Sequence, residues 1–124
     1  TLSRVRDLEL SQIPTVRLGA SRSIALATVE GSATGFAVLL DAREHPIRWV
    51  DARSLDNASK PIEQSGRGIT VMHQPEDTLQ DALSSMLQTS TGMSVIVDGR
   101  GRYLGCVTIE ALAQLLVQTQ SGAA

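Results

Sequence analysis

The chain of 124 residues has a formal net charge of -2, and 42% of its residues are hydrophobic while 19% are charged. This length fits one compact domain or two very small intertwined ones, because a core of fewer than roughly 40 residues rarely folds alone. The composition favours a folded chain. Without a basic excess, and with Phe36, Trp49 and Tyr103 as its only aromatic residues, the chain lacks the charge and the stacking platforms that nucleic-acid binding needs.

Several protein classes are excluded by what the sequence lacks. The single Cys106 has no partner for an internal disulfide, and no Cys/His group has the spacing of a metal site. No apolar run approaches the ~20 residues that cross a bilayer, and no secretory signal opens the chain. No nucleophile-and-base motif or phosphate-binding loop is present, so we assign no catalytic residue and no metal ligand. We expect a cytoplasmic, non-catalytic protein without direct membrane insertion, and the start at Thr1 rather than Met is consistent with an excised fragment.

The first half of the chain predicts a strand, a helix and a hairpin, in that order. The apolar residues Val5, Leu8 and Leu10 form a lead-in segment that we expect to dock on the other half. The predicted elements are a strand over residues 15–18, a helix over 24–29, strands over 36–40 and 47–50, and a short helical turn through Leu55.

The second half predicts the same order after a polar connection over residues 57–66. A strand over 68–72 comes first. Asp77 and Thr78 then precede a helix whose apolar residues recur at three- and four-residue spacing, namely Leu79, Ala82, Leu83, Met86 and Leu87. Two β-forming runs, 93–97 and 103–108, flank the turn Asp98-Gly99-Arg100-Gly101 and predict a hairpin. A final helix is predicted from Ile109 to Val117.

The two halves are copies of one unit. An offset of 57 positions, as from Ala25 to Ala82, aligns identical residues in one ungapped frame. The other matches are Leu26 with Leu83, Gly35 with Gly92, Val38 with Val95, Asp41 with Asp98, Arg43 with Arg100, Val50 with Val107, and Leu55 with Leu112. The hydrophobic pattern repeats as well, so each copy is predicted to be strand, helix, hairpin, helix.

A duplicated unit of this kind resembles the CBS domain pair, or Bateman module, and the segment GMSVIVDGRGRYLGCVTIEAL looks like the second half of a CBS repeat. The resemblance implies an α/β fold in which each repeat is a small sheet of two or three strands packed by two helices. The repeats would be related by pseudo-two-fold symmetry. We expect repeat 1 with its lead-in at residues 1–58, a linker at 59–67 and repeat 2 at 68–124.

The segment VDGRGRYLGCVTIEAL is most similar to the CBS pair that follows the ATPase domain in glycine betaine, carnitine and choline ABC transporters. This resemblance implies a regulatory module that responds to cyclic di-AMP or to ionic strength. Its implied partners are a second copy of the module in a homodimer, the attached ATPase domain and the transporter permease, at the inner face of the cell membrane. The alternative is a ligand-free structural dimerisation module.

CBS domains commonly bind adenosine nucleotides through a Thr or Ser after the last strand and an Asp three residues later. Thr108 matches the first role, but Ala111 stands at the second. In the first repeat Asp51 would repel a phosphate, and Arg48 replaces the glycine that survives as Gly105, so that its side chain is expected to fill the cleft. These departures count against AMP and ATP, most strongly in the first repeat.

For cyclic di-AMP, the resemblance places the candidate contacts in the second repeat. They are Met72, Met93, Ser94, Cys106, Thr108 and Ile109, at strand ends and the start of the following helix, where backbone N–H groups hold phosphate. An arginine there would strengthen the assignment, yet Ile109 and Glu110 occupy the position. Thr108 is equally interpreted as an ordinary helix N-cap, and Cys106 as a small buried residue.

The remaining polar and aromatic residues have ordinary structural interpretations. His45 and His73 are predicted to be exposed loop residues rather than metal ligands or acid-base groups, with no partner visible in the sequence. Arg43, Arg100 and Arg102 belong to turns, although an anion or a partner protein is an alternative contact. Phe36 and Trp49 either stack a base in a cleft or, as we expect, fill core volume.

Overall fold

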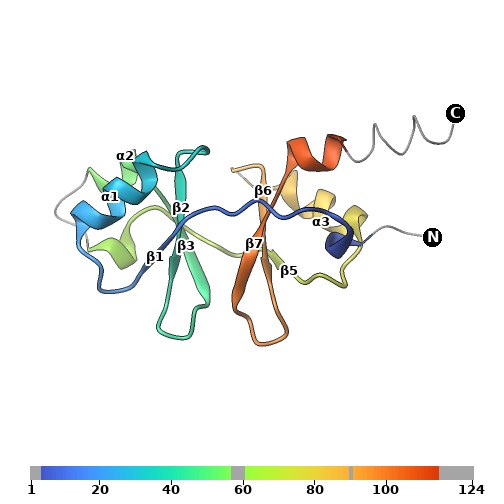
Figure 1. Cartoon of the computed structure of the whole chain (residues 1–124), viewed down its shortest axis with the longest axis horizontal. Helices are drawn as coiled ribbons and strands as arrows, with labels where there is room; N and C mark the ends of the chain where they lie inside the picture. The colour runs from blue at the N-terminus through green and yellow to red at the C-terminus, as the bar shows by residue number, and fades with distance from the viewer. Residues whose placement is uncertain (1–3, 57–60, 90, 115–124) are drawn as a thin grey trace, which may run out of the picture.

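The computed structural model describes residues 4–56, 61–89 and 91–114. Two small sheets lie at the centre with their hairpins side by side, and the helices cover the two outer sides (Figure 1). The predicted α/β class with two small sheets is confirmed. Within the described residues no helix combines the length and the apolar character that crossing a membrane requires.

The first sheet has four strands in the order β1-β2-β3-β4. β1 pairs in parallel with β2, and β2 pairs antiparallel with β3 through the predicted hairpin. The elements of this half are β1 (Thr15–Arg17), α1 (Arg22–Glu30), β2 (Phe36–Leu40), β3 (Pro46–Asp51), α2 (Ala52–Leu55) and β4 (Arg67–Gly68).

The second sheet has three strands in the order β5-β6-β7. Its elements are β5 (Met72–His73), α3 (Leu79–Met86), β6 (Met93–Val97) and β7 (Tyr103–Thr108), and residues 109–114 are helical. Residues 115–117 of the last predicted helix lie outside the described residues. The strand predicted over 68–72 is wrong as a single element: Gly68 pairs with Arg48 in the first sheet, whereas Met72 pairs with Val95 in the second. The chain passes between the sheets within this run, so one strand cannot serve both.

The sequence repeat is also a repeat of hydrogen-bond register. Phe36 pairs with Asp51 in the first hairpin, and Met93 pairs with Thr108 in the second, so both partners are displaced by 57 positions. The irregularity between Leu39 and Leu40 recurs between Ile96 and Val97. Both long helices begin with a hydroxyl cap at equivalent positions, since the side chains of Ser21 and Thr78 accept backbone N–H groups.

Each repeat is covered by a short helical segment that precedes the other repeat in the chain. The 3-10 helix η1 (Val5–Asp7) packs on the second repeat, where Val5 is fully buried with Leu79 and Met86. Its counterpart η2 (Ile62–Gln64) packs on the first repeat, where Ile62 is buried with Leu55. The docking predicted for the lead-in segment is confirmed, with Leu8 and Leu10 packed against the same cluster as Val5.

The core has three layers. A central cluster between the sheets contains Val38, Trp49, Met93 and Val95, with other residues from both hairpins. Two outer clusters fill the space between each sheet and its helices. Because burial of one such aliphatic side chain stabilises by about 1.5–3 kcal/mol, the shared central layer makes the two repeats one folding unit.

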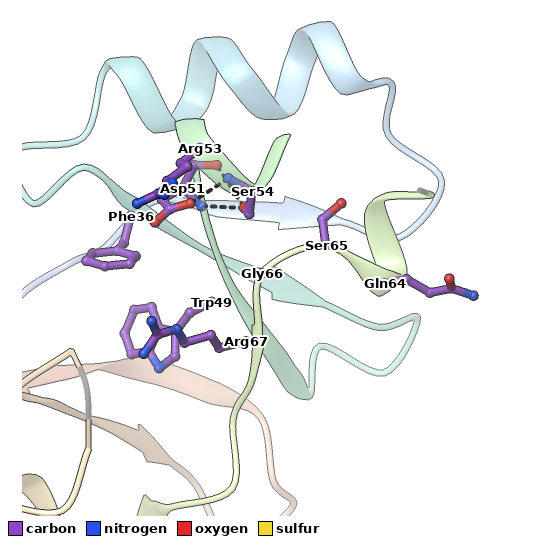
Figure 2. A pocket seen from close by; sticks show the side chains of 9 residues that line it. All are labelled: Phe36, Trp49, Asp51, Arg53, Ser54, Gln64, Ser65, Gly66 and Arg67. Atoms are coloured by element: carbon purple, nitrogen blue, oxygen red, sulfur yellow. Dashed lines mark hydrogen bonds between the residues drawn. The ribbon is translucent and has the colours of Figure 1, made fainter. Parts of the chain in front are cut away.

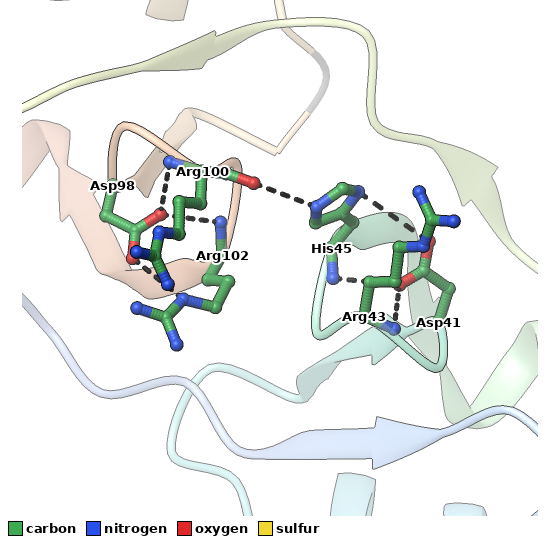
Figure 3. Close-up of polar contacts among 6 residues, drawn as sticks. All are labelled: Asp41, Arg43, His45, Asp98, Arg100 and Arg102. Atoms are coloured by element: carbon green, nitrogen blue, oxygen red, sulfur yellow. Dashed lines mark hydrogen bonds and ion pairs between the residues drawn. The ribbon is translucent and has the colours of Figure 1, made fainter.

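The hairpin tips contact each other through a histidine (Figure 3). His45 donates from Nε2 to the carbonyl oxygen of Arg100 over 2.9 Å, and the backbone N–H of Tyr103 donates to the carbonyl of Glu44 over 3.1 Å. His45 lies in the hairpin turn, as predicted, with its side chain 39% exposed, whereas the prediction of an exposed loop residue is wrong for His73. His73 lies in β5 with its side chain 12% exposed, and its Nδ1 is 3.0 Å from Oδ2 of Asp77.

Candidate functional site

The helices that follow the two hairpins begin with different caps in the same geometry. In the first repeat Oδ1 of Asp51 accepts the backbone N–H of Ser54 over 2.8 Å. In the second repeat Oγ1 of Thr108 accepts the backbone N–H of Ala111 over 3.1 Å. The N-cap interpretation of Thr108 is confirmed, and its hydroxyl oxygen already accepts one hydrogen bond.

The six residues predicted as nucleotide contacts are only partly brought together. Met93, Thr108 and Ile109 line one groove of about 510 Å³, together with Phe36 and Glu110. Its other lining residues are Ala33, Thr34, Thr91 and Gly92. The remaining three candidates, Met72, Ser94 and Cys106, do not line this groove.

Ser94 and Cys106 are fully buried, and Met72 is 44% exposed at the start of β5. Cys106 belongs to the central core, where burial raises the pKa of its thiol to about 12. The thiol is therefore protonated at neutral pH and unreactive, in agreement with the interpretation as a small buried residue. Ser94 precedes Val95 on β6, and its hydroxyl has no hydrogen-bond partner among the described residues.

A pocket of about 410 Å³ lies in the first repeat, where sequence reasoning had not placed a site (Figure 2). It opens between the end of β3, the start of α2 and the segment that leads into β4. Its lining residues are Phe36, Trp49, Asp51, Arg53, Ser54, Gln64, Ser65, Gly66 and Arg67. The volume is within the range of small-molecule sites.

One wall of this pocket is aromatic. The rings of Phe36 and Trp49 meet edge to face, with centroids 5.8 Å apart and planes at 70°. Trp49 is 6% exposed and belongs to the central core, so the interpretation as core filling is confirmed. Both rings nevertheless line the pocket, so filling the core and forming a binding wall are compatible roles here.

The other walls carry charge. Arg53 and Arg67 are exposed, and within residues 4–56, 61–89 and 91–114 neither guanidinium has an ion pair or hydrogen bond. Asp51 is half-buried and caps α2, while Ser54 donates its hydroxyl to the Asp51 carbonyl over 2.9 Å. The pocket thus combines two unpaired cations, one carboxylate and an aromatic wall.

Arg48 does not line this pocket, so the expectation that it fills the first-repeat cleft is wrong. Its guanidinium donates to the carbonyl oxygen of Gly66 over 3.3 Å. Gly66 has a φ of +74°, and a Cβ atom at this position would lie 1.9 Å from the carbonyl oxygen of Trp49. Glycine is therefore required for the linker to approach β3 closely enough to form the pocket wall.

Sequence reasoning sought an arginine at the helix start of the second repeat and overlooked Arg53, which stands at the helix start of the first. Arg67 was missed because the linker was treated as a polar connection. The 57-position offset could have drawn attention to Arg67, because it aligns residues 64–67 of the linker with residues 7–10 of the lead-in segment. Among the described residues no group of three or more His, Cys, Asp or Glu side chains is placed to hold a metal ion.

Comparison with known proteins matches no family model and no curated protein sequence. The solved structures do match. The CBS-pair protein CBSX2 from Arabidopsis thaliana superimposes with a TM-score of 0.82 at 16% identity, covering 98% of this chain and 99% of that one. OpuCA of Staphylococcus aureus gives 0.75 at 16% identity, covering 89% and 97%.

A third match is the cystathionine beta-synthase pair domain of the putative Mg2+ transporter SO5017 from Shewanella oneidensis, with a TM-score of 0.76 at 14% identity. It covers 95% of this chain and 72% of that one. A structure of CBSX2 in complex with AMP also matches, with a TM-score of 0.78 at 16% identity over 95% and 98% of the two chains. The duplicated register, the crossed lead-in segments and these superpositions agree that this chain has the fold of a CBS domain pair.

Proposed function

We propose that this chain is a non-catalytic regulatory module that binds an adenine nucleotide in the first-repeat pocket and controls an attached transporter ATPase. The observation that carries the proposal is the combination of the Phe36 and Trp49 wall with the exposed guanidiniums of Arg53 and Arg67. A flat heterocycle packs against aromatic side chains, and guanidinium groups pair with phosphate oxygens. The AMP complex of CBSX2, a protein of the same fold, supports this ligand class.

The carboxylate of Asp51 fits a ribose better than a phosphate. One of its oxygens accepts the Ser54 N–H, and the carboxylate accepts hydrogen bonds but donates none. A ribose hydroxyl is a donor that satisfies it, whereas a phosphate next to it is repelled. The phosphate is therefore expected near the guanidinium of Arg53 or Arg67 rather than beside the Asp51 carboxylate.

The controlled protein is proposed from the sequence resemblance of residues 97–112 to osmoprotectant transporter CBS pairs. In this proposal the module sits at the inner face of the cell membrane through its parent ATPase and pairs with a second copy. Ligand or ionic strength then biases the parent between active and inhibited states, because a ligand that binds one state better shifts the population toward it. The CBS pair of a putative Mg2+ transporter shows the same fold in another transporter setting.

A second position for the nucleotide, and the one proposed for cyclic di-AMP, is the groove lined by Met93, Thr108 and Ile109. The ligand-free dimerisation role is favoured by a different observation. Ile24 on α1 is 59% exposed and Leu87 at the end of α3 is 70% exposed, so both helical sides present apolar surface.

Thermal unfolding with AMP, ATP, cyclic di-AMP or buffer alone tests the proposal. A ligand at 100 times its dissociation constant stabilises the folded state by about 2.7 kcal/mol, which raises the melting temperature by several degrees. We expect a shift with an adenine nucleotide that Arg67→Leu removes and Thr108→Ala retains. A shift that only Thr108→Ala removes would move the site to the second repeat, and no shift with any nucleotide would favour the dimerisation role.

A further inference from the structure

The internal repeat gives every residue of the first-repeat pocket a counterpart in the other half of the molecule. The offset of 57 positions pairs Phe36 with Met93, Trp49 with Cys106, Asp51 with Thr108, Arg53 with Glu110, Ser54 with Ala111, and Gln64, Ser65, Gly66 and Arg67 with Asp7, Leu8, Glu9 and Leu10. The hairpins share strand register and the following helices share cap geometry, so the pairs there compare side chains at equivalent places on one backbone. The connecting segments are displaced by one residue: Arg67 pairs with Trp49, whereas Ser11 pairs with the equivalent Cys106, so Arg67 has Leu10 as its sequence counterpart and Ser11 as its pairing counterpart, neither of them a cation.

The charges of the two places are opposite. Arg53 at the start of α2 is replaced by Glu110, and Arg67 of β4 is replaced by Leu10. Two further acidic residues, Asp7 and Glu9, are exposed on the lead-in segment. Among the described residues, no guanidinium lines the grooves at the second place, and the carboxylates of Asp7, Glu9 and Glu110 that line them repel a phosphate.

The apolar wall has changed as well. What is lost is its aromatic pair: Trp49 is replaced by Cys106, which is fully buried, and Phe36 is replaced by Met93, which lines its groove beside Phe36 itself. The equivalent space is also divided. Residues 7–11 line one groove of about 440 Å³ with Ala111 and Gln114, whereas Met93, Thr108 and Glu110 line a separate one.

Close packing of the lead-in segment accompanies this division. A Cβ atom built on Gly105 would lie 2.9 Å from the Cβ of Leu10 and 3.2 Å from the carbonyl oxygen of Ser11. Ser11 pairs with Cys106 through two backbone hydrogen bonds of 2.8 and 2.9 Å. Leu10 is half-buried and packs on the outer core, whereas the equivalent Arg67 is exposed in the pocket.

We infer that the two places have diverged so that each chain takes one phosphate-bearing nucleotide, in the first repeat, and that Arg53 and Arg67 determine this choice. The inference rests on the proposed nucleotide binding. It adds that one of two equivalent places excludes the ligand by charge, and that single residues exchanged between the repeats transfer the selectivity.

The test is calorimetric titration of the intact chain with AMP, using variants in which one repeat receives the residue of the other. The expected stoichiometry is one AMP per chain. Arg67→Leu and Arg53→Glu each lower the affinity roughly 10- to 100-fold, the effect of losing a charge-assisted hydrogen bond. Arg67→Lys, which keeps the charge, retains more of the affinity than Arg67→Leu.

Matched variants on the other side of the pseudo-symmetry are the controls. Glu110→Arg and Thr108→Ala change the equivalent helix start and are expected to leave the tight site within about twofold of its original affinity. Thermal unfolding without ligand verifies that each variant is folded. Two equal sites per chain would overturn the inference alone. Loss of AMP binding in Thr108→Ala with Arg67→Leu unaffected would overturn the inference and also the first-repeat position of the proposed site. No binding of AMP, ATP or cyclic di-AMP to the original chain would overturn the proposed function, and the inference with it.

Discussion

The first repeat caps its last helix with Asp51, and the second repeat caps its last helix with Thr108, yet both side chains accept the backbone N–H three residues later. The backbone requires an oxygen acceptor at this position, and either a carboxylate or a hydroxyl provides one. The cap residue alone therefore does not decide whether a phosphate binds beside it. The residues around the cap do: Arg53 and Arg67 in one repeat, and Glu110 and Leu10 in the other.

The two repeats share the strand register of their hairpins but differ in their exposed side chains, so the fold constrains the backbone pairing more than these side chains. Pairing, bulge and turn recur because every backbone polar group in the hairpins needs its partner. Exposed side chains at the sheet ends have no such requirement, so they diverge freely. Variants at equivalent positions of the two repeats therefore test which of these features the fold requires.

The largest difference in unfolding free energy is expected between substitutions of two glycines, one in each repeat, at which a connecting segment lies close to the hairpin. Gly66→Ala places a Cβ atom 1.9 Å from a backbone carbonyl oxygen at positive φ, and we expect a loss of about 3 kcal/mol or more in unfolding free energy. Gly105→Ala meets the Leu10 Cβ at 2.9 Å and the Ser11 carbonyl oxygen at 3.2 Å at positive φ, and it is expected to cost less because these approaches are less severe than 1.9 Å. Urea unfolding measures both.

Gly99→Ala is the matched control for these glycine variants, since nothing lies within 4 Å of its added Cβ and its φ is not in the positive range. It should change the unfolding free energy by no more than about 0.5 kcal/mol. Equal losses in all three variants would show that the close approach of the linker to β3 is not required.

Substitutions at the hairpin tips are expected to have the next largest effect on stability. His45→Ala removes the hydrogen bond to the Arg100 carbonyl and should lower the unfolding free energy by about 1 kcal/mol. At the equivalent position Arg102 forms an exposed ion pair with Asp98 over 3.0 Å, so Arg102→Ala should cost less than His45→Ala. A larger loss for Arg102→Ala in thermal unfolding would contradict the role of His45 as the contact between the hairpins.

The caps should behave alike despite their different chemistry. Asp51→Ala and Thr108→Ala each remove one side-chain acceptor for a helix N–H, and each should cost about 1 kcal/mol in urea unfolding. If one cap proved neutral while the other cost the full amount, the structural equivalence of the two junctions would fail.

The smallest expected effect is on the stability of the folded chain at low pH. Backbone N–H donation, chiefly from His45 to Asp41 and from Arg102 to Asp98, holds the pKa of each carboxyl below its ordinary value of 3.8. A lowered folded-state pKa contributes stability that is present above the unfolded value and is lost as pH falls through the folded value. Stability should thus decline below about pH 4, and less steeply in Asp41→Asn or Asp98→Asn. If stability declined with falling pH as steeply in both variants as in the original chain, these two carboxyls would not cause the decline.

Hydrophobic period and turn chemistry predicted the hairpins well. β2, β6 and β7 have the predicted boundaries, because short apolar runs next to Asp-containing turns leave little choice of register. The run over residues 68–72 was mispredicted because no turn residue marks where the chain leaves one sheet for the other. Partner choice there depends on the distant strands β3 and β6.

The site was harder to predict than the fold. Asp51 was interpreted only for its effect on a phosphate, and Thr108 either as a phosphate contact or as an N-cap, while the structure uses both as caps. Arg53 and Arg67 come from a four-residue helix and a two-residue strand, and such short elements carry no periodic signal. Only their convergence with Trp49 in space makes them a candidate site.

The most direct test of the central claim uses Trp49, the only tryptophan of the chain, as a reporter in the first-repeat pocket. Titration with AMP is predicted to change its fluorescence saturably, with a response that Arg67→Leu weakens and Glu110→Arg leaves intact. AMP binding detected by calorimetry without any change in Trp49 fluorescence, or a response lost only in Glu110→Arg, would contradict the assignment of the ligand to the first repeat.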